Sequence, residues 1–367
     1  MERRRFITAA GAGVAGLAAG CSARRTDEGS TVGTTGGGAT TLRVGTYGSF
    51  IDAPSTSPGG WLKKQFESEF DATLEWFAPE GGMDYFLTRR KEGVTIDTDL
   101  YLGLTPENLV RADRGVEGDQ SLFTNLDTSA LSNADAVIDD YRFDPRNRAI
   151  PFGASYISLV YNQLMFDERG VEAPTTFDDL TADPYRDALL VPNPQNSETG
   201  LEFLFWTVDQ FGADGFLDYW SQLVDNGATI LKGWSAAYSA YSDGEAPAVV
   251  SYSTDQVYAT RYDQNIKKHQ VGFLNGEGYA YLEGVAPFAG TEKMGLAEQF
   301  VDFVLQPDIQ AEIAQRNVAL PAVSNATLPS DYDELVYEPE TVVSYSYDEL
   351  SGNMETWLSE WSKEIAG

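Results

Sequence analysis

The sequence predicts an α/β fold from about residue 42 to the C-terminal end, arranged as two domains or as one large unit with two lobes. Short apolar segments with strand character alternate with segments of helical period, and this order indicates a sheet with parallel strands. The length of 367 residues suits two domains, because one domain usually takes about 100–200 residues. Hydrophobic residues make up 42% of the chain and aromatic residues 12%, which is enough for a core and excludes global disorder.

The elements expected in the first part of the chain are strands at 42–47, 72–77 and 94–102, a helix at about 60–70, and a helix that follows Gly81-Gly82 and runs through Arg90. Thr105-Pro106-Glu107 predicts the start of a further helix. It combines a hydroxyl N-cap, a proline at the first helical position and an acid in the first turn.

The elements expected in the rest of the chain are strands at 150–161, 188–191, 248–252 and about 279–287, and helices at about 200–211, 213–224, 296–305, 308–315 and 348–365. The last of these helices is amphipathic and carries Trp357 and Trp361. No internal repeat is visible in the sequence.

The charge of the chain excludes several classes of function. There are 56 acidic residues against 25 basic ones, of which only 8 are lysine, and the formal net charge is -31. Such a chain repels nucleic acid. Acids spread along a lysine-poor chain are typical of proteins adapted to molar salt, where the screening length falls to about 3 Å. The single Cys and the single His exclude a disulfide framework and any metal centre built from several Cys or His.

The first residues predict an export signal and a lipid anchor. Arg3-Arg4-Arg5 precedes a short apolar run, and the arginines followed by Phe6-Ile7 resemble a twin-arginine signal. The run ends in a segment that resembles a lipoprotein box, so Cys21 is expected to carry lipid after residues 1–20 are removed. Residues 21–41 are rich in Gly, Ser and Thr and predict a flexible tether at the outer face of the membrane.

A series of short motifs then resembles one protein family, the periplasmic thiamine-binding proteins of ABC importers. The strongest pair is Lys232-Gly233-Trp234-Ser235 followed by Ser251-Tyr252-Ser253-Thr254. Further motifs keep the order of the family and include Thr46-Tyr47-Gly48-Ser49-Phe50, Ala78-Pro79-Glu80-Gly81-Gly82, Ser197 with Gly200-Leu201, Thr327-Leu328-Pro329 and Ser359-Glu360-Trp361. The resemblance covers nearly all of residues 42–365.

The resemblance implies a two-lobed type II periplasmic-binding-protein-like fold with crossover strands as a hinge. Lobe one is expected at 42–148 plus 285–367 and lobe two at 149–284, with the ligand between them. The implied function is that of a monomeric extracytoplasmic receptor, not an enzyme and without a cofactor. It would capture thiamine or its phosphates and deliver them to an ABC permease.

The ligand contacts implied by the resemblance are Gly81, Gly82, Ser197, Glu198, Trp234, Tyr252, Ser253, Thr254, Asp255 and Gln256, with Tyr47 and Tyr258 as further walls. Thiamine carries a permanent thiazolium charge, which aromatic faces attract. Glycines ahead of a helix expose N–H groups that suit a phosphate. Taken singly, these aromatic residues are more typical of a core, the glycines of a turn and Ser197 of a helix cap.

Two positions depart from the pattern of the family. Val318 lies where an aromatic residue is usual, so one wall of the expected cage differs. Glu198 lies beside the expected phosphate position, where its carboxylate disfavours phosphate and favours a cation unless a base offsets it.

Two other functions compete with a thiamine receptor. A receptor of the same fold for Fe(III) could use tyrosinates such as Tyr238 and Tyr241. A secreted hydrolase with a Ser-His-Asp triad would have to use His269, which we expect at the solvated surface beside Lys267-Lys268, and no G-x-S-x-G motif is present. A glycosidase built on two carboxylates is a weaker form of the same alternative.

Overall fold

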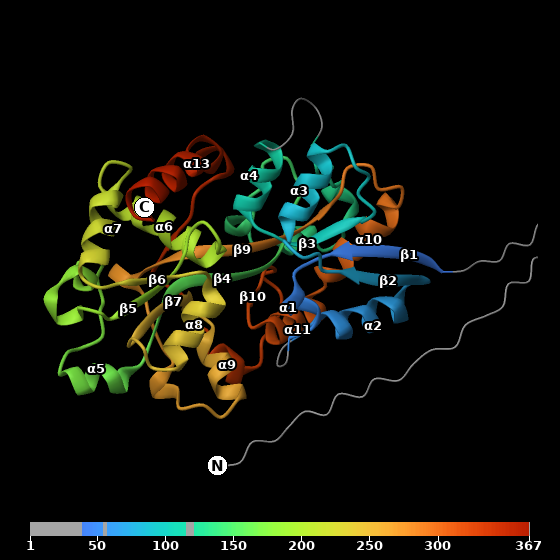
Figure 1. Ribbon diagram of the computed structural model, residues 1–367. Helices are drawn as coiled ribbons and strands as arrows, with labels where there is room; N and C mark the ends of the chain where they lie inside the picture. The colour runs from blue at the N-terminus through green and yellow to red at the C-terminus, as the bar shows by residue number, and fades with distance from the viewer. Residues whose placement is uncertain (1–38, 54–56, 115–120, 367) are drawn as a thin grey trace, which may run out of the picture. The chain divides into compact units, whose positions relative to one another are not determined.

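The structure is a computed structural model that describes residues 39–53, 57–114 and 121–366 (Figure 1). The predicted signal, the lipid-anchor residue Cys21 and most of the predicted tether lie outside the described residues. Within the described ranges, no helix combines the length and the apolar character that crossing a membrane would require.

The strands form one mixed sheet in the order β2-β1-β3-β9-β4-β7-β5-β6, with β10 and β8 paired to β4 and β11 paired to β9. Their bounds are β1 Thr40–Gly45, β2 Ala72–Phe77, β3 Leu100–Leu104, β4 Ile150–Tyr161, β5 Leu189–Pro192, β6 Thr229–Leu231, β7 Ala248–Tyr252, β8 Gln270–Gly272, β9 Glu277–Pro287, β10 Leu320–Pro321 and β11 Thr341–Val343. The two long strands β4 and β9 run antiparallel in the centre and join the two ends of the sheet (Figure 1).

Helices lie on both sides of this sheet (Figure 1). Their bounds are α1 Gly48–Ile51, α2 Gly59–Glu69, α3 Met83–Lys91, α4 Pro106–Arg114, α5 Gln163–Arg169, α6 Glu198–Phe211, α7 Phe216–Asp225, α8 Trp234–Ser242, α9 Asp255–Arg261, α10 Met294–Val304, α11 Pro307–Asn317, α12 Ser330–Asp333 and α13 Tyr347–Glu364. The predicted start of α4 is confirmed, because Pro106 is its first residue and the Thr105 hydroxyl accepts a hydrogen bond from the Asn108 backbone N–H at 3.3 Å.

The predicted strands at 72–77, 150–161 and 248–252 are confirmed with the same bounds. The predicted strand at 94–102 is wrong in its first half, since β3 begins only at Leu100. Gly93 has a positive φ of 66° and Val94 is 40% exposed, so the alternating pattern here belongs to a solvated loop. The folded part also begins earlier than expected, because Thr40 already pairs with Ala72.

The strand directions agree only in part with a parallel sheet. The pairs at the two ends, β1 with β2 and β3, and β5 with β6 and β7, are parallel. The central pairs β3 with β9, β9 with β4 and β4 with β7 are antiparallel. Alternation of strands and helices along the sequence indicates a parallel sheet but does not indicate where the chain returns between its halves.

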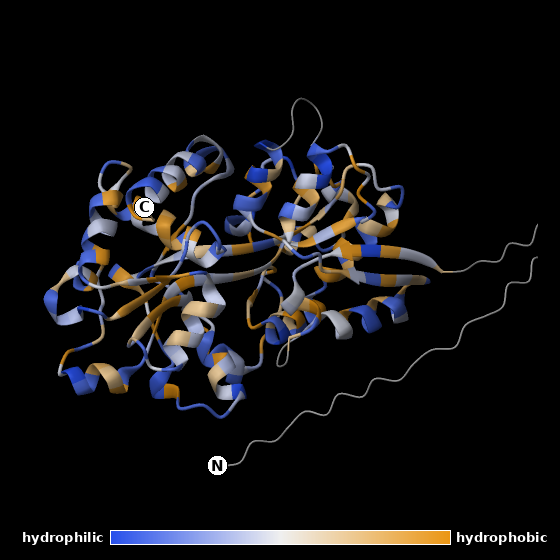
Figure 2. Ribbon diagram, in the orientation of Figure 1, coloured by the Kyte–Doolittle hydropathy of each residue, from blue (hydrophilic) through white to orange (hydrophobic). Residues whose placement is uncertain are grey.

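Hydrophobic cores lie at both ends of the sheet, and the hydropathy colouring of Figure 2 shows apolar residues along the strands. One core is rich in phenylalanine, where Phe66 meets Phe300 and Phe303 at ring centroid distances of 5.3 and 5.5 Å. In the other core, Trp220 of α7 lies edge-on to Trp361 of α13 at 5.3 Å. The division into lobes stays a prediction, although α13, expected in lobe one, packs here against a helix expected in lobe two.

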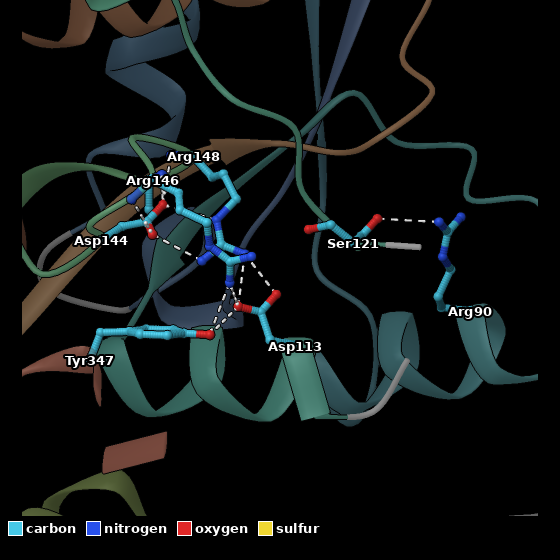
Figure 3. Close-up of polar contacts among 8 residues, drawn as sticks. Arg90, Asp113, Ser121, Asp144, Arg146, Arg148 and Tyr347 are labelled. Carbon is cyan, nitrogen blue, oxygen red and sulfur yellow. Dashed lines mark hydrogen bonds and ion pairs between the residues drawn. The ribbon is translucent and has the colours of Figure 1, made fainter. Parts of the chain in front are cut away.

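A cluster of charges around Arg148 ties three segments together (Figure 3). Arg148 is 1% exposed, and its guanidinium donates to Asp144 at 2.9 Å and to Asp113 of α4 at 2.6 Å. Asp113 also accepts hydrogen bonds from Arg146 and from the hydroxyl of Tyr347, the first residue of α13. The cluster therefore fixes α4 to the start of β4 and to α13.

Replacing Asp144 by Asn should lower the free energy of unfolding by about 3–5 kcal/mol, because it removes the fully buried carboxylate that pairs with the buried Arg148. Burial opposes ionisation of Asp144, but the hydrogen bonds and charge of Arg148 outweigh it and lower the pKa of this carboxyl. The stabilisation is therefore present above the unfolded pKa of about 3.9 and is lost as the pH falls through the lower folded pKa. Denaturant unfolding at fixed salt and several pH values measures both effects.

The matched control is Asp139→Asn, since Asp139 pairs with Arg142 while 96% exposed. Exposed pairs contribute little, so this variant should unfold like the wild type. Equal stability of the Asp144 and Asp139 variants would contradict a stabilising role for the cluster.

Candidate functional site

A cleft of about 1250 Å³ is lined by residues from both halves of the sheet. Its walls come from the carboxyl ends of β1, β3, β5 and β7 and from the first residues of α3, α6 and α8. Most of the residues implied by the resemblance line it, namely Tyr47, Gly81, Gly82, Ser197, Glu198, Trp234, Tyr252, Thr254, Asp255 and Tyr258. The fold thus brings residues from distant parts of the chain into one cavity.

Ser253 and Gln256 do not line the cleft, although both were expected there. Ser253 is completely buried and its backbone N–H donates to the Tyr156 carbonyl oxygen at 2.9 Å. The side-chain oxygen of Gln256 accepts a hydrogen bond from Tyr337 at 3.2 Å. Side chains of an extended segment alternate between its two faces, so Tyr252 faces the cleft and its neighbour Ser253 faces away.

Trp234, Tyr238, Tyr252 and Tyr281 form an aromatic wall along one side of the cleft. The ring centroids of Trp234 and Tyr238 are 5.2 Å apart, those of Trp234 and Tyr252 are 5.9 Å apart, and those of Tyr252 and Tyr281 are 5.1 Å apart. These separations are typical of aromatic pairs that stabilise each other. The wall offers ring faces to a flat or cationic ligand.

Two hydrogen bonds hold the aromatic wall in place. The indole N–H of Trp234, the first residue of α8, donates to the Ser251 hydroxyl at 3.0 Å. The hydroxyl of Thr199, in the first turn of α6, donates to the Tyr252 hydroxyl at 2.9 Å. Because the rings are fixed before a ligand enters, binding costs little side-chain entropy.

Two helix N-termini open onto the cleft. Gly81 and Gly82 precede α3 with positive φ values of 89° and 55°, a conformation that favours glycine. Ser197 is the N-cap of α6, but its side chain caps no backbone N–H of that helix. A Cβ on Gly200 would lie 2.1 Å from the Pro192 carbonyl oxygen, so glycine lets α6 start close to the end of β5. Exposed N–H groups at such ends suit an anion.

A chain of polar contacts crosses the mouth of the cleft. The carboxylate of Glu198 on α6 accepts a hydrogen bond from the side-chain amide of Asn108 on α4 at 2.6 Å. Arg111 donates to the Asn108 side-chain oxygen at 3.3 Å and to Asp84 at 2.5 Å. Burial raises the pKa of Glu198 above its ordinary value. The hydrogen bond from Asn108 and the charge of Arg111 act in the opposite direction but do not cancel the effect of burial. Arg111 and Lys232 line the cleft and place positive charge near this carboxylate.

Glu283 lies on the floor of the cleft and was not expected as a site residue. One of its oxygens, Oε2, accepts hydrogen bonds from the Tyr47 hydroxyl and from the Asn317 side-chain amide, each at 3.3 Å. Burial raises the pKa of Glu283 to about 8. A sequence signal existed, because Glu283 is an acid inside the otherwise apolar strand segment Tyr279–Pro287.

Val318 lines the cleft where the family pattern carries an aromatic residue. It ends α11 with φ and ψ of 54° each, a left-handed conformation that a β-branched residue rarely adopts. This part of the cleft is therefore lined by the Asn317 amide, Val318 and Ala319, and the aromatic faces of the cleft come from other elements.

The expectation that His269 is solvated is wrong. His269 is 7% exposed, and its Nδ1 lies 2.8 Å from a carboxylate oxygen of Asp255, whose other oxygen accepts a hydrogen bond from Tyr238. The adjacent lysines suggested a surface position, but the histidine ring turns inward toward α9. It supports the orientation of Asp255 in the cleft.

Tyr238 and Tyr241 do not converge on a metal position. Tyr241 does not line the cleft, and its hydroxyl donates to the Lys268 carbonyl oxygen. In the ranges that the structure covers, no group of three or more His, Cys, Asp or Glu side chains has the arrangement of a metal site.

The parallel strands end at a cleft, and antiparallel strands run through the centre of the sheet. This α/β fold is that of the periplasmic binding proteins, and a cleft at strand ends is where such folds bind ligands. The chain belongs to the family of bacterial extracellular solute-binding proteins, which matches residues 61–336.

Among its relatives, the thiamine-binding periplasmic protein of Escherichia coli strain K12 is 28% identical over 325 residues, which is 89% of this chain and 93% of the relative. A solved periplasmic thiamin-binding protein superposes with a TM-score of 0.75 at 26% identity, covering 89% of this chain and 96% of that chain. The ferric iron-binding protein A of Mannheimia haemolytica in an open conformation has a TM-score of 0.67 at 14% identity, with 89% and 98% covered, which shows a shared fold alone.

Proposed function

We propose that this protein captures thiamine outside the cytoplasm and delivers it to an ABC importer. The observation that carries the proposal is the cleft itself, which combines the aromatic wall with two open helix N-termini. The relatives named as thiamine-binding proteins extend over nearly the whole chain and support the same ligand.

The chemistry of thiamine fits the two kinds of surface in the cleft. Its thiazolium ring is a permanent cation, and a cation over Trp or Tyr gains about 0.5–2 kcal/mol, depending on desolvation. Its flat aminopyrimidine suits stacking against the same rings. The hydroxyethyl arm, or a phosphate on it, reaches toward the N-termini of α3 and α6, where N–H groups and Arg111 supply positive potential.

The position in the cell follows from the family and from the N-terminal motif. The proposed receptor is exported by the twin-arginine route, anchored by lipid on Cys21, and works as a monomer in molar salt with no cofactor besides its ligand. A net charge of -31 keeps such a surface soluble when salt screens the repulsion.

Iron is a weaker candidate for the ligand. The iron-binding neighbour shares the fold. However, Tyr238 is engaged by Asp255 and Tyr241 by a backbone carbonyl, so the tyrosine pair considered for Fe(III) is committed to internal hydrogen bonds. Addition of Fe(III) should therefore produce no red tyrosinate absorbance.

Thiamine should quench the intrinsic fluorescence saturably, and Trp234→Ala should weaken binding by about 1–3 kcal/mol because a ring face of the aromatic wall is lost. Calorimetry in molar salt gives the affinities. The matched control is Trp61→Phe, because Trp61 lies on α2 beneath the Arg316 guanidinium and does not line the cleft. Unchanged affinity of the Trp234 variant would remove this residue from the site.

Glu198 should penalise thiamine phosphates relative to thiamine, because an ionised carboxylate repels phosphate at the same helix N-terminus. Glu198→Thr should shift the preference toward the phosphorylated forms by removing this repulsion. The measurement is a pair of dissociation constants, for thiamine and thiamine diphosphate, at one salt concentration.

Glu92→Thr is the control for this experiment, since Glu92 is exposed just after α3 and lies outside the cleft. If the wild type binds the diphosphate more tightly and the Glu198 variant keeps the same ratio, the carboxylate does not act on the phosphate.

Replacing Cys21 by Ser should abolish lipidation and release the protein from the membrane, because the thiol is the attachment point of the proposed lipid. Membrane fractionation and mass spectrometry of the N-terminal peptide measure the change, with Ser22→Ala as the control that should stay anchored.

Replacing Arg3-Arg4 by Lys should block export, and normal lipidation of that variant would point to a different export route.

A further inference from the structure

Glu283 is an isolated buried acid at a place where a ligand can reach it. It is 3% exposed, lies opposite Gly153 in the β4–β9 pair and contributes to the floor of the cleft. Its Oε2 is hydrogen-bonded to Tyr47 and Asn317, but its Oε1 is buried and has no hydrogen-bond partner. A buried polar atom without a partner is costly, which makes it a marker of a missing interaction.

Two glycines bring the backbone of β3 and β4 close to this carboxyl. A Cβ on Gly103 would lie 3.5 Å from Oε1, and one on Gly153 would lie 3.8 Å from Oε2. Gly103 has a φ of 100°, a conformation that L side chains rarely adopt, so the backbone itself favours glycine there. The carboxyl is therefore enclosed by backbone and phenol groups, with the cleft on its open side.

Glu283 has no basic partner among the described residues, where its hydrogen-bond partners are the Tyr47 hydroxyl and the Asn317 amide. The titratable groups that act on it or feel its charge are acids and phenols, namely Tyr47 ahead of α1, Tyr101 of β3, Tyr252 of β7, Tyr281 of β9, and Glu198 and Glu202 of α6.

The protonation state of the carboxyl in the empty cleft follows from this environment. Burial raises the pKa of Glu283 to about 8 and the charge of Glu198 acts in the same direction, against the hydrogen bonds from Tyr47 and Asn317. At neutral pH the group is therefore mostly protonated and uncharged.

We propose that Glu283 is the counter-ion for a permanently cationic ligand in this cleft, and that the positive charge of the ligand displaces the carboxyl proton on binding. The step is balanced in charge, since one cation enters the cleft as one proton leaves to solvent. The inference rests on the proposed function, because thiamine supplies the cation through its thiazolium ring. It adds a specificity element, since a neutral molecule of the same shape gains nothing from the carboxylate.

The proposal fixes the sign of the pH dependence. A ligand that binds the deprotonated form gains affinity as the pH rises toward the pKa of the free group, by about tenfold per pH unit, and levels off above about pH 8. Close to one proton should be released per thiamine at neutral pH. Glu107, whose pKa is raised to about 7 by burial, titrates in the same range but does not line the cleft.

The experiment is calorimetry of thiamine binding between about pH 6 and 8.5. The salt concentration is held fixed in the molar range, and each pH is measured in a pair of buffers with different ionisation enthalpies. The buffer dependence of the heat counts the protons released. A second ligand, in which a neutral thiophene ring replaces the thiazolium, is measured in parallel; because both ligands carry the same aminopyrimidine, its titration cancels in the comparison. The variants are Glu283→Gln and, as the matched control, Glu107→Gln.

The expected result is proton release and a rising affinity for thiamine with wild type and with Glu107→Gln, and neither effect with Glu283→Gln or with the neutral analogue. Equal proton release for thiamine and the neutral analogue on the wild type would overturn the proposal even if Glu283→Gln failed to fold. Thiamine binding with a pH-independent affinity would overturn this inference and leave the proposed function intact. Absence of thiamine binding at every pH would overturn both.

Discussion

The antiparallel pairing of β4 with β9 is the constraint on which the cleft depends. The two strands are paired from Ile150 and Val285 at one end to Ile157 and Tyr279 at the other. The parallel strands β1 and β3 lie on one side of this pair and β5 and β7 on the other, and residues at or after the ends of β1, β5 and β7 all line the same cleft. Ligand sites in open α/β sheets form at such carboxyl ends, and here two sets of ends face one another.

Three buried acids share raised pKa values, and of these Glu283 lines the cleft while Glu107 and Glu202 do not. Glu283 lies on β9, while Glu107 and Glu202 lie on α4 and α6, and all three are at most 3% exposed. Burial raises the pKa of each of them, and the like charge of Glu198 raises all three further. Salt cannot screen these buried acids, so protonation or a cation must compensate their charge.

The departure at Val318 and the aromatic wall belong together. Val318 is aliphatic, and aromatic ring faces in the cleft come from other elements, among them α8 and β7 with Trp234, Tyr238 and Tyr252. The hydrogen bonds from Trp234 to Ser251 and from Thr199 to Tyr252 show that this surface is prepared by neighbouring elements. Selectivity for a flat cation can then come from one wall and the floor together.

The sequence by itself determined the α/β class, the strands at 150–161 and 248–252 and the start of α4, because local apolar patterns and capping residues control these features. Its motifs in order also indicated twelve cleft residues, of which all but Ser253 and Gln256 line the cleft. Only the tertiary structure decided that His269 turns inward, that Ser253 and Gln256 are buried away from the cleft, and that the buried Glu283 lines the cleft. Each of these positions depends on which face of a strand or loop packs against an element distant in the sequence. A shift of one residue in the register moves a side chain to the other face, and the local sequence pattern does not predict that packing.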